Sequence, residues 1–155
     1  MMLGSTSSYD LIFDRITETS VPEGVDASVL EQVVRCVLEA EQAIGAWEIT
    51  VVLVDDDRLR TLHRDFMNVD EVTDVMTFPT TEAPIGVHTG GGEIVISVDR
   101  AAAQCVDVGH TPGEEIRFLV SHGVLHLCGW DDLAPGARYA MLTRQHAILR
   151  NCTLP

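Results

Sequence analysis

The sequence predicts an α+β fold: a single domain over residues 1–155, with a mixed β-sheet of about four strands packed with about five helices. Two observations support this prediction. A length of 155 residues suits one hydrophobic core. Strand and helix patterns alternate through the first two thirds of the chain, whereas the last third contains two long helical patterns. No internal repeat or low-complexity segment divides the chain.

The first two predicted elements are a strand and a helix. Residues 9–17 are rich in β-branched and aromatic side chains, which predicts a strand. Ser28 and Glu31 have the spacing of a capping box, and apolar residues follow at helical intervals. A helix is therefore predicted from Ser28 to near Gly45.

Residues 47–54 form a short apolar run that predicts a buried strand. Asp55, Asp56 and Asp57 follow it, and acidic residues stabilise the start of a helix, so a second helix is predicted there. Three consecutive aspartates are also compatible with a cation site. We favour capping, because no matching ligand set follows at loop spacing.

The middle of the chain predicts two more strands, at residues 74–78 and 93–98, and a short helix at residues 99–106. A loop with Pro84 and Gly90–Gly92 joins the two strands. These glycines lack the context of a phosphate-binding loop, so a flexible hairpin connection is favoured over a phosphate cradle.

Two helices are predicted at the C-terminal end. Residues 111–114 (TPGE) combine an N-cap threonine, an early proline and a capping-box glutamate. This helix should run to about Cys128, where Gly129 stops it. Residues 135–150 predict the final helix.

The charge balance excludes some classes of protein. The chain has 24 acidic and 10 basic residues, giving a formal net charge of −14. This argues against binding to nucleic acid through bulk charge, although a local arginine patch is compatible with it. No apolar run approaches the roughly 20 residues of a membrane span, and the first residues lack a secretory pattern. We expect a cytoplasmic protein with no membrane partner.

The four cysteines, Cys36, Cys105, Cys128 and Cys152, form no CxxC pair. Disulfides are rare in the reducing cytosol. The sequence therefore predicts free thiols at all four positions.

The segment with the clearest chemistry is SHGVLHLCGWDD, residues 121–132. His122 and His126 are four residues apart, which places both imidazoles on one face of the predicted helix. A turn at Gly129 can bring Asp131 or Asp132 back to the same point. Two imidazoles and one carboxylate form a metal-binding set that leaves coordination positions open for water.

A histidine pair with this spacing also occurs by chance. Here the helix is otherwise strongly apolar, and two buried histidines without partners would be unfavourable, so a metal site is favoured. The spacing matches the long zincin motif of metallopeptidases. However, Gly123 stands where those enzymes carry the glutamate that acts as general base, which argues against a peptidase.

With Gly123 in place, this segment resembles the signature of the YbeY family, H-G-x-L-H-L-x-G-[YW]-D-H. Two strands also resemble family motifs: residues 73–79 (TDVMTFP) and residues 92–97 (GEIVIS). The resemblance covers the chain from about Trp47 to its end. The matching residues of the signature are His122, Gly123, Leu125, His126, Leu127, Gly129, Trp130 and Asp131.

The resemblance implies a single-strand-specific, metal-dependent endoribonuclease. Such an enzyme acts in ribosomal RNA maturation at the 3′ end of the small-subunit RNA, and in ribosome quality control. Its partners would be ribosomal RNA, the ribosome and assembly factors, and its metal helix would line a cleft. A bound ion, with zinc expected, would acidify a water and polarise a phosphoryl oxygen.

The implied metal ligands are His122, His126 and Asp132. The family carries histidine at the third position, and aspartate there adds one negative charge and weakens the metal as a Lewis acid. Asp131 either orients a ligating histidine or caps the following turn, and the sequence leaves both interpretations open. No general base is assigned. The other histidines, His63, His88, His110 and His146, are expected to be surface or capping residues.

A second departure concerns RNA binding. The family motif Y-R-G-K-D-K-P-T carries an arginine, where this chain has Met67, and two lysines, where it has Val69 and Glu71. Arg64 lies about one helical turn earlier and is a candidate to replace that arginine.

Three other functions are compatible with the sequence. The protein could be a ribosome-assembly factor that binds RNA without cleaving it, which the missing basic residues favour. A metallopeptidase is disfavoured by Gly123. A metal that only stabilises the fold would make the protein unfold on chelation.

Overall fold

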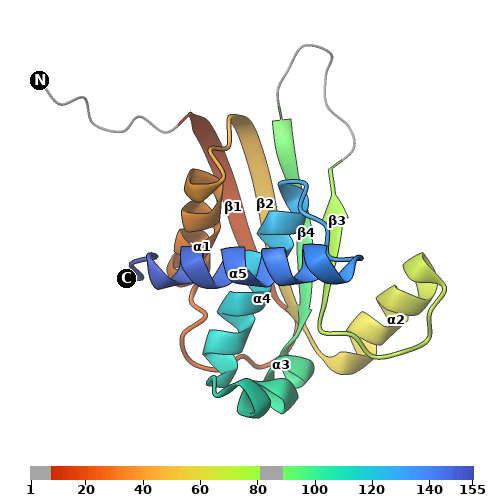
Figure 1. Ribbon diagram of the computed structural model, residues 1–155. Coiled ribbons are helices and arrows are strands. Elements are labelled where there is room, and N and C mark those ends of the chain that lie inside the picture. Colours follow the sequence, from red (N-terminus) through yellow and green to blue (C-terminus); the bar gives the residue numbers. More distant parts are fainter. Residues whose placement is uncertain (1–7, 81–88) are drawn as a thin grey trace, which may run out of the picture.

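A computed structural model describes residues 8–80 and 89–155 (Figure 1). Its four strands form one sheet in the order β1-β2-β4-β3. β1, β2 and β4 are parallel, and β3 runs antiparallel to β4, so the sheet is mixed, as predicted. The strands are β1 (Tyr9–Thr17), β2 (Gly45–Val54), β3 (Val75–Pro79) and β4 (Thr89–Ser97).

Five α-helices cover this sheet. α1 and α4 pack on one face, and α5 lies across them as an outer layer, whereas α2 packs against β3 and β4 (Figure 1). Among the described residues, no helix is long and apolar enough to cross a membrane. The helices are α1 (Ala27–Ala40), α2 (Asp56–Met67), α3 (Val98–Gln104), followed by a 3-10 turn at Cys105–Val108, α4 (Pro112–Leu127) and α5 (Pro135–Arg150). The predicted α+β class is therefore confirmed.

Alternate side chains of β4 pack into two separate hydrophobic clusters. Ile94 and Ile96 are fully buried in the cluster that α1 and α4 complete, whereas Val95 packs with Leu59 of α2 in a smaller cluster. This alternation follows from the two-residue period of a strand. It holds α4, the helix with the histidine pair, directly over β4.

Two helix starts form as the sequence predicts. The Asp55 carboxylate accepts a hydrogen bond from the backbone nitrogen of Arg58 (2.8 Å), which caps α2. Thr111 and Glu114 form a complete capping box at the start of α4. α4 ends at Leu127, and Gly129 turns the chain with a φ of 103°.

The start of α1 differs from the prediction. Asp26 is the N-cap residue, so Ser28 lies inside the helix, and the predicted capping box is wrong. The Glu31 carboxylate instead pairs with Arg35 one turn later, at 3.0 Å. α1 ends at Ala40 rather than near Gly45, and Gly45 is the first residue of β2.

The predicted hairpin forms, because β3 and β4 are consecutive and antiparallel, but Gly90–Gly92 do not belong to its loop: they lie in β4, between β2 and β3. A Cβ on Gly91 would lie 2.0 Å from the Glu48 carbonyl oxygen. A Cβ on Gly92 would lie 2.2 Å from the Phe78 carbonyl oxygen. Glycine is therefore required by close backbone approach rather than by flexibility. Pro84 of the predicted loop lies outside the described residues.

The cysteine prediction is corrected as well. Cys36 of α1 and Cys152, just after α5, form a disulfide, while Cys105 and Cys128 are free. The two bonded residues are 116 positions apart, but their Cα atoms are 5.8 Å apart because the end of α5 packs beside α1. That distance is typical of a disulfide.

We predict that reducing this disulfide lowers the free energy of unfolding by about 2 to 5 kcal/mol, because the bond closes a long loop in the unfolded chain. Urea unfolding with and without dithiothreitol measures the difference. The Cys36→Ser variant is the control, since it should unfold at one midpoint under both conditions. Equal midpoints for the wild type in the two buffers would contradict the prediction.

Candidate metal centre

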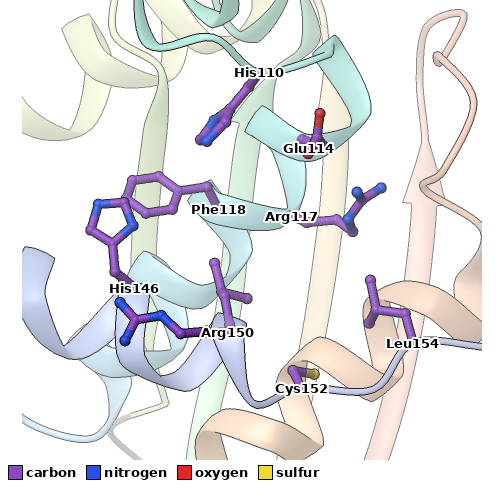
Figure 2. A pocket seen from close by; sticks show the side chains of 9 residues that line it. His110, Glu114, Arg117, Phe118, His146, Arg150, Cys152 and Leu154 are labelled. Atoms are coloured by element: carbon purple, nitrogen blue, oxygen red, sulfur yellow. The ribbon is translucent and has the colours of Figure 1, made fainter.

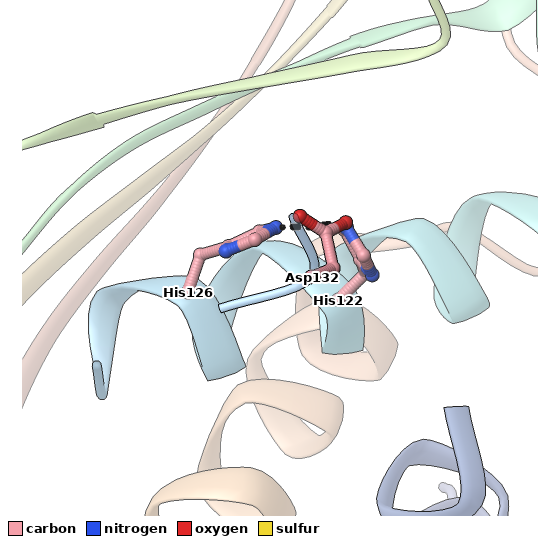
Figure 3. A group of neighbouring side chains, drawn as sticks. All are labelled: His122, His126 and Asp132. Carbon is pink, nitrogen blue, oxygen red and sulfur yellow. Dashed lines mark hydrogen bonds and ion pairs between the residues drawn. The ribbon is translucent and has the colours of Figure 1, made fainter. Parts of the chain in front are cut away.

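α4 and the turn after it bring three potential ligands to one point (Figure 3). The Nε2 atoms of His122 and His126 are 2.9 Å apart. The Asp132 Oδ2 atom lies 3.3 Å from the first and 3.6 Å from the second. The side chains are between 19% and 29% exposed, so the group is neither sealed off nor fully solvated.

The opposite ring nitrogens have fixed acceptors. His126 Nδ1 lies 3.0 Å from the Trp130 carbonyl oxygen, which can only accept, so this nitrogen carries the proton. His122 Nδ1 lies 3.1 Å from Oε1 of Gln145. The Gln145 amide nitrogen donates to the Phe118 carbonyl (3.2 Å) and to Ser121 Oγ (3.3 Å), which orients Oε1 toward His122.

These contacts fit a divalent cation. When both Nδ1 atoms carry protons, the two Nε2 atoms of the neutral rings present lone pairs to each other and to a carboxylate oxygen. Lone pairs at 2.9 Å repel, and a cation held among them removes the repulsion. Separations of 2.9 to 3.6 Å suit donors that share an ion with bonds of about 2.0 to 2.2 Å.

Residues from α5 and from the C-terminal cap of α1 hold this arrangement in place. Gln145 of α5 is fully buried. The Trp130 indole nitrogen donates to Glu41, which also accepts from Arg144 at 2.8 Å, so the turn after α4 is tied to both helices. Burial, with a smaller effect of Glu41, raises the pKa of the Cys128 thiol to about 12.

Gly123 faces the sheet. A Cβ at this position would lie 2.7 Å from Cγ2 of Ile94 in β4. The position that carries the general base in zincins therefore has no room for a side chain here, which explains in steric terms why the peptidase pattern is broken.

A cavity of about 260 Å³ opens beside two of the three potential ligands. His122 and Asp132 line it, together with Arg138 of α5 and the carboxylates of Asp74 and Glu115. Gln104 donates to both of these carboxylates, at 3.0 and 2.8 Å. Among the described residues that line this cavity, Arg138 supplies a guanidinium group.

Among the described residues, the other two predicted site residues are not part of this group of potential ligands. The Asp131 carboxylate accepts a hydrogen bond from the backbone nitrogen of Leu133 (2.8 Å), which is the turn-capping geometry. Arg64 lies on α2, is 53% exposed and pairs with Asp65 at 3.3 Å. It is not among the described residues that line the cavity.

Sequence reasoning missed four groups at this site. Gln145 and Arg138 belong to a separate helix, where no spacing links them to the histidines. The Trp130 carbonyl is a backbone group, which residue type does not reveal. Asp74 could have been found, because it lies within the matched strand motif TDVMTFP.

Comparisons with known proteins agree with the resemblance. The family model described as Endoribonuclease YbeY matches residues 12–153. The Endoribonuclease YbeY of Moorella thermoacetica is 40% identical over 131 residues, which cover 79% of this chain and 83% of that protein. That of Roseiflexus sp. is 36% identical over 133 residues, covering 81% and 83%. A solution structure from Thermotoga maritima has 27% identity and a TM-score of 0.56, and the match covers 88% of this chain and 87% of the other.

Proposed function

The chain belongs to the YbeY family of endoribonucleases, and on that premise we propose that it cleaves single-stranded RNA with one divalent metal ion. The observation that supports this most strongly is the convergence of two imidazoles and a carboxylate, of which His122 and Asp132 line an open cavity. We further propose that one domain carries the activity and that it acts in the cytoplasm, although the Cys36–Cys152 disulfide is unusual for that compartment. Its substrate would be ribosomal RNA, which it would process at the 3′ end of the small-subunit RNA. It would also act in ribosome quality control, and its partners would be the ribosome and assembly factors.

In this proposal His122, His126 and Asp132 hold the ion, which we expect to be zinc. When bound, it would supply an acidified water and polarise a phosphoryl oxygen. Gln145 and the Trp130 carbonyl keep both imidazoles in the tautomer that leaves Nε2 free. Asp131 acts as a positioning residue, because it fixes the turn that presents Asp132.

Two arginines are candidates for contact with RNA. Arg138 lines the cavity at the metal ligands and has the five-donor guanidinium that suits a phosphate. Arg64 stays a candidate from the sequence, at the surface of α2. It would bind the RNA strand outside the cavity.

We predict that Arg138→Ala lowers RNA cleavage by about 10-fold or more, because a cation aimed at the reacting phosphate is lost. Arg64→Ala should weaken RNA affinity by about 2- to 5-fold, the effect of one exposed phosphate contact. Initial cleavage rates and fluorescence anisotropy measure the two effects. An unchanged cleavage rate for Arg138→Ala would show that Arg138 does not contact the reacting phosphate. An unchanged RNA affinity for Arg64→Ala would show that Arg64 does not bind the RNA.

The family assignment leaves one alternative with a specific observation behind it. Met67 is 61% exposed at the end of α2, where the family carries its arginine, and Val69 and Glu71 replace two lysines nearby. A chain with fewer cations there would suit a ribosome-assembly factor that binds RNA without cutting it.

Single-turnover cleavage of a labelled single-stranded RNA, with and without a chelator, separates these functions. The proposed enzyme cleaves the RNA, stops when the ion is removed and stays folded. The assembly factor binds the RNA and leaves it intact under both conditions. Unfolding on chelation would instead indicate a metal that only stabilises the fold.

A further inference from the structure

Figure 2 shows the residues that line a second cavity, of about 350 Å³. Phe118 lines both this cavity and the metal cavity, so the two adjoin. The rings of His110, Phe118 and His146 contribute to its wall, together with the guanidinium groups of Arg117 and Arg150. The volume is in the usual range for small-ligand sites, about 300 to 1,000 Å³. None of the roles proposed above uses this cavity.

The three rings form a continuous aromatic surface. The centroids of Phe118 and His146 are 5.1 Å apart with an interplanar angle of 35°, and those of His110 and Phe118 are 5.8 Å apart. His110 Nδ1 donates to the buried carboxylate of Glu115 (2.9 Å), which fixes its ring. His146 is exposed, so one face of its ring is open for a planar group such as a nucleobase to stack on.

One face of α5 connects the two cavities. Arg138, Leu142, His146 and Arg150 follow at intervals of four residues, so they lie on the same side of the helix. The first two line the metal cavity and the last two line the second cavity. Twelve residues of helix span roughly 18 Å, the length of about five stacked nucleotides.

The charge of α5 is unlike that of the rest of the chain. The helix has three arginines and no acidic residue, in a protein with a formal net charge of −14. Glu114 is the acidic side chain among the residues that line the second cavity. Its Oε1 atom accepts from the backbone nitrogen of Thr111 (2.9 Å), which holds this carboxylate at the start of α4. Arg144 is paired with Glu41, whereas Arg138 and Arg150 line the two cavities and have no ion pair with another described residue, so these two are available to a polyanion.

We propose that the second cavity binds a nucleotide of single-stranded RNA that flanks the cleaved phosphodiester. The base stacks on His146 and Phe118, and its phosphate contacts Arg150. The strand then follows α5 to Arg138 and the metal ligands. This inference rests on the proposed endoribonuclease activity and adds where the strand lies beyond the reacting bond.

The test is RNA affinity as a function of salt concentration. Fluorescence anisotropy of a labelled 12-nucleotide single-stranded RNA, with phosphorothioate linkages to slow cleavage, gives Kd between 50 and 200 mM salt. The double variant His146→Ala/Arg150→Ala should raise Kd by about 10-fold or more. Arg150→Ala alone should lower the slope of log Kd against log salt by about 0.7, the loss of one phosphate contact on a single strand.

Two matched variants separate an RNA contact from a general effect. Arg58→Ala removes the same charge from α2, where the Arg58 guanidinium forms a long pair of 3.9 Å with Glu18, and should change Kd by less than about twofold. Arg150→Lys keeps the charge and should keep the salt slope. Arg117 is left unchanged, because it donates to the Gly24 carbonyl and supports that turn.

The outcomes distinguish this inference from the function on which it rests. A Kd for the double variant within twofold of a wild type that binds and cleaves RNA would overturn the second site and leave the endoribonuclease standing. A loss of slope in Arg150→Lys as large as in Arg150→Ala would overturn the phosphate contact. A wild type that neither binds nor cleaves RNA would overturn both proposals.

Discussion

Replacing His126 with alanine is expected to abolish RNA cleavage, with a rate reduced by at least roughly 100-fold. The variant removes one of three proposed ligands, and even the loss of a group that only orients a ligand reduces metal affinity or activity by about 10- to 100-fold. The Nε2 atom of His122 and the Asp132 carboxylate would remain, but two donors hold an ion less tightly than three. The measurement is single-turnover cleavage at a fixed zinc concentration.

Two further variants sharpen this experiment. Gln145→Ala leaves all three ligands in place but removes the acceptor for His122 Nδ1, so an intermediate loss of about 10-fold is expected. His63→Ala removes a histidine from α2 whose Nδ1 contacts the Glu71 carbonyl, and it should cleave at the wild-type rate. Full activity in His126→Ala would contradict the proposed site.

The second large effect is expected on stability. Gly123→Glu restores the sequence pattern of a zincin, but it should destabilise the fold by more than about 3 kcal/mol instead of creating a peptidase. The new Cβ would lie 2.7 Å from the Ile94 side chain, and the carboxylate would be forced between α4 and β4. Thermal unfolding measures the change.

The control for this variant is Gly136→Glu. Gly136 lies in the first turn of α5, and a Cβ there meets nothing within 4 Å. An acidic residue in a first turn is favourable, so this variant should unfold at or slightly above the wild-type temperature. A Gly123→Glu protein as stable as Gly136→Glu would show that α4 does not pack on β4 as described.

Local patterns made much of the fold predictable. The strand at residues 9–17 and the helix at residues 135–150 form with the predicted bounds, because each depends on side-chain types and helix signals within its own segment. The capping box at Thr111 and Glu114 forms for the same reason. At the metal centre, the four-residue spacing predicted that His122 and His126 share a face.

The remaining features depend on contacts between distant segments. Gly91 and Gly92 resemble a loop in sequence, and only pairing with β2 and β3 shows that they occupy a strand. Cys36 and Cys152 have no spacing signal, because the packing of α5 beside α1 brings them together. Gln145 lies 23 residues from His122, so its role as an acceptor could not be read from a local motif.

The most direct test of the proposed metal site is the metal content of the purified protein, measured by elemental mass spectrometry on the wild type and on Asp132→Ala. The wild type is expected to carry one divalent ion per chain, and the variant is expected to lose most of it, because Asp132 supplies the third donor at 3.3 and 3.6 Å from the imidazoles. A wild type without metal, or a variant that keeps its ion, would contradict the proposed His122, His126 and Asp132 site and the metal-dependent cleavage built on it.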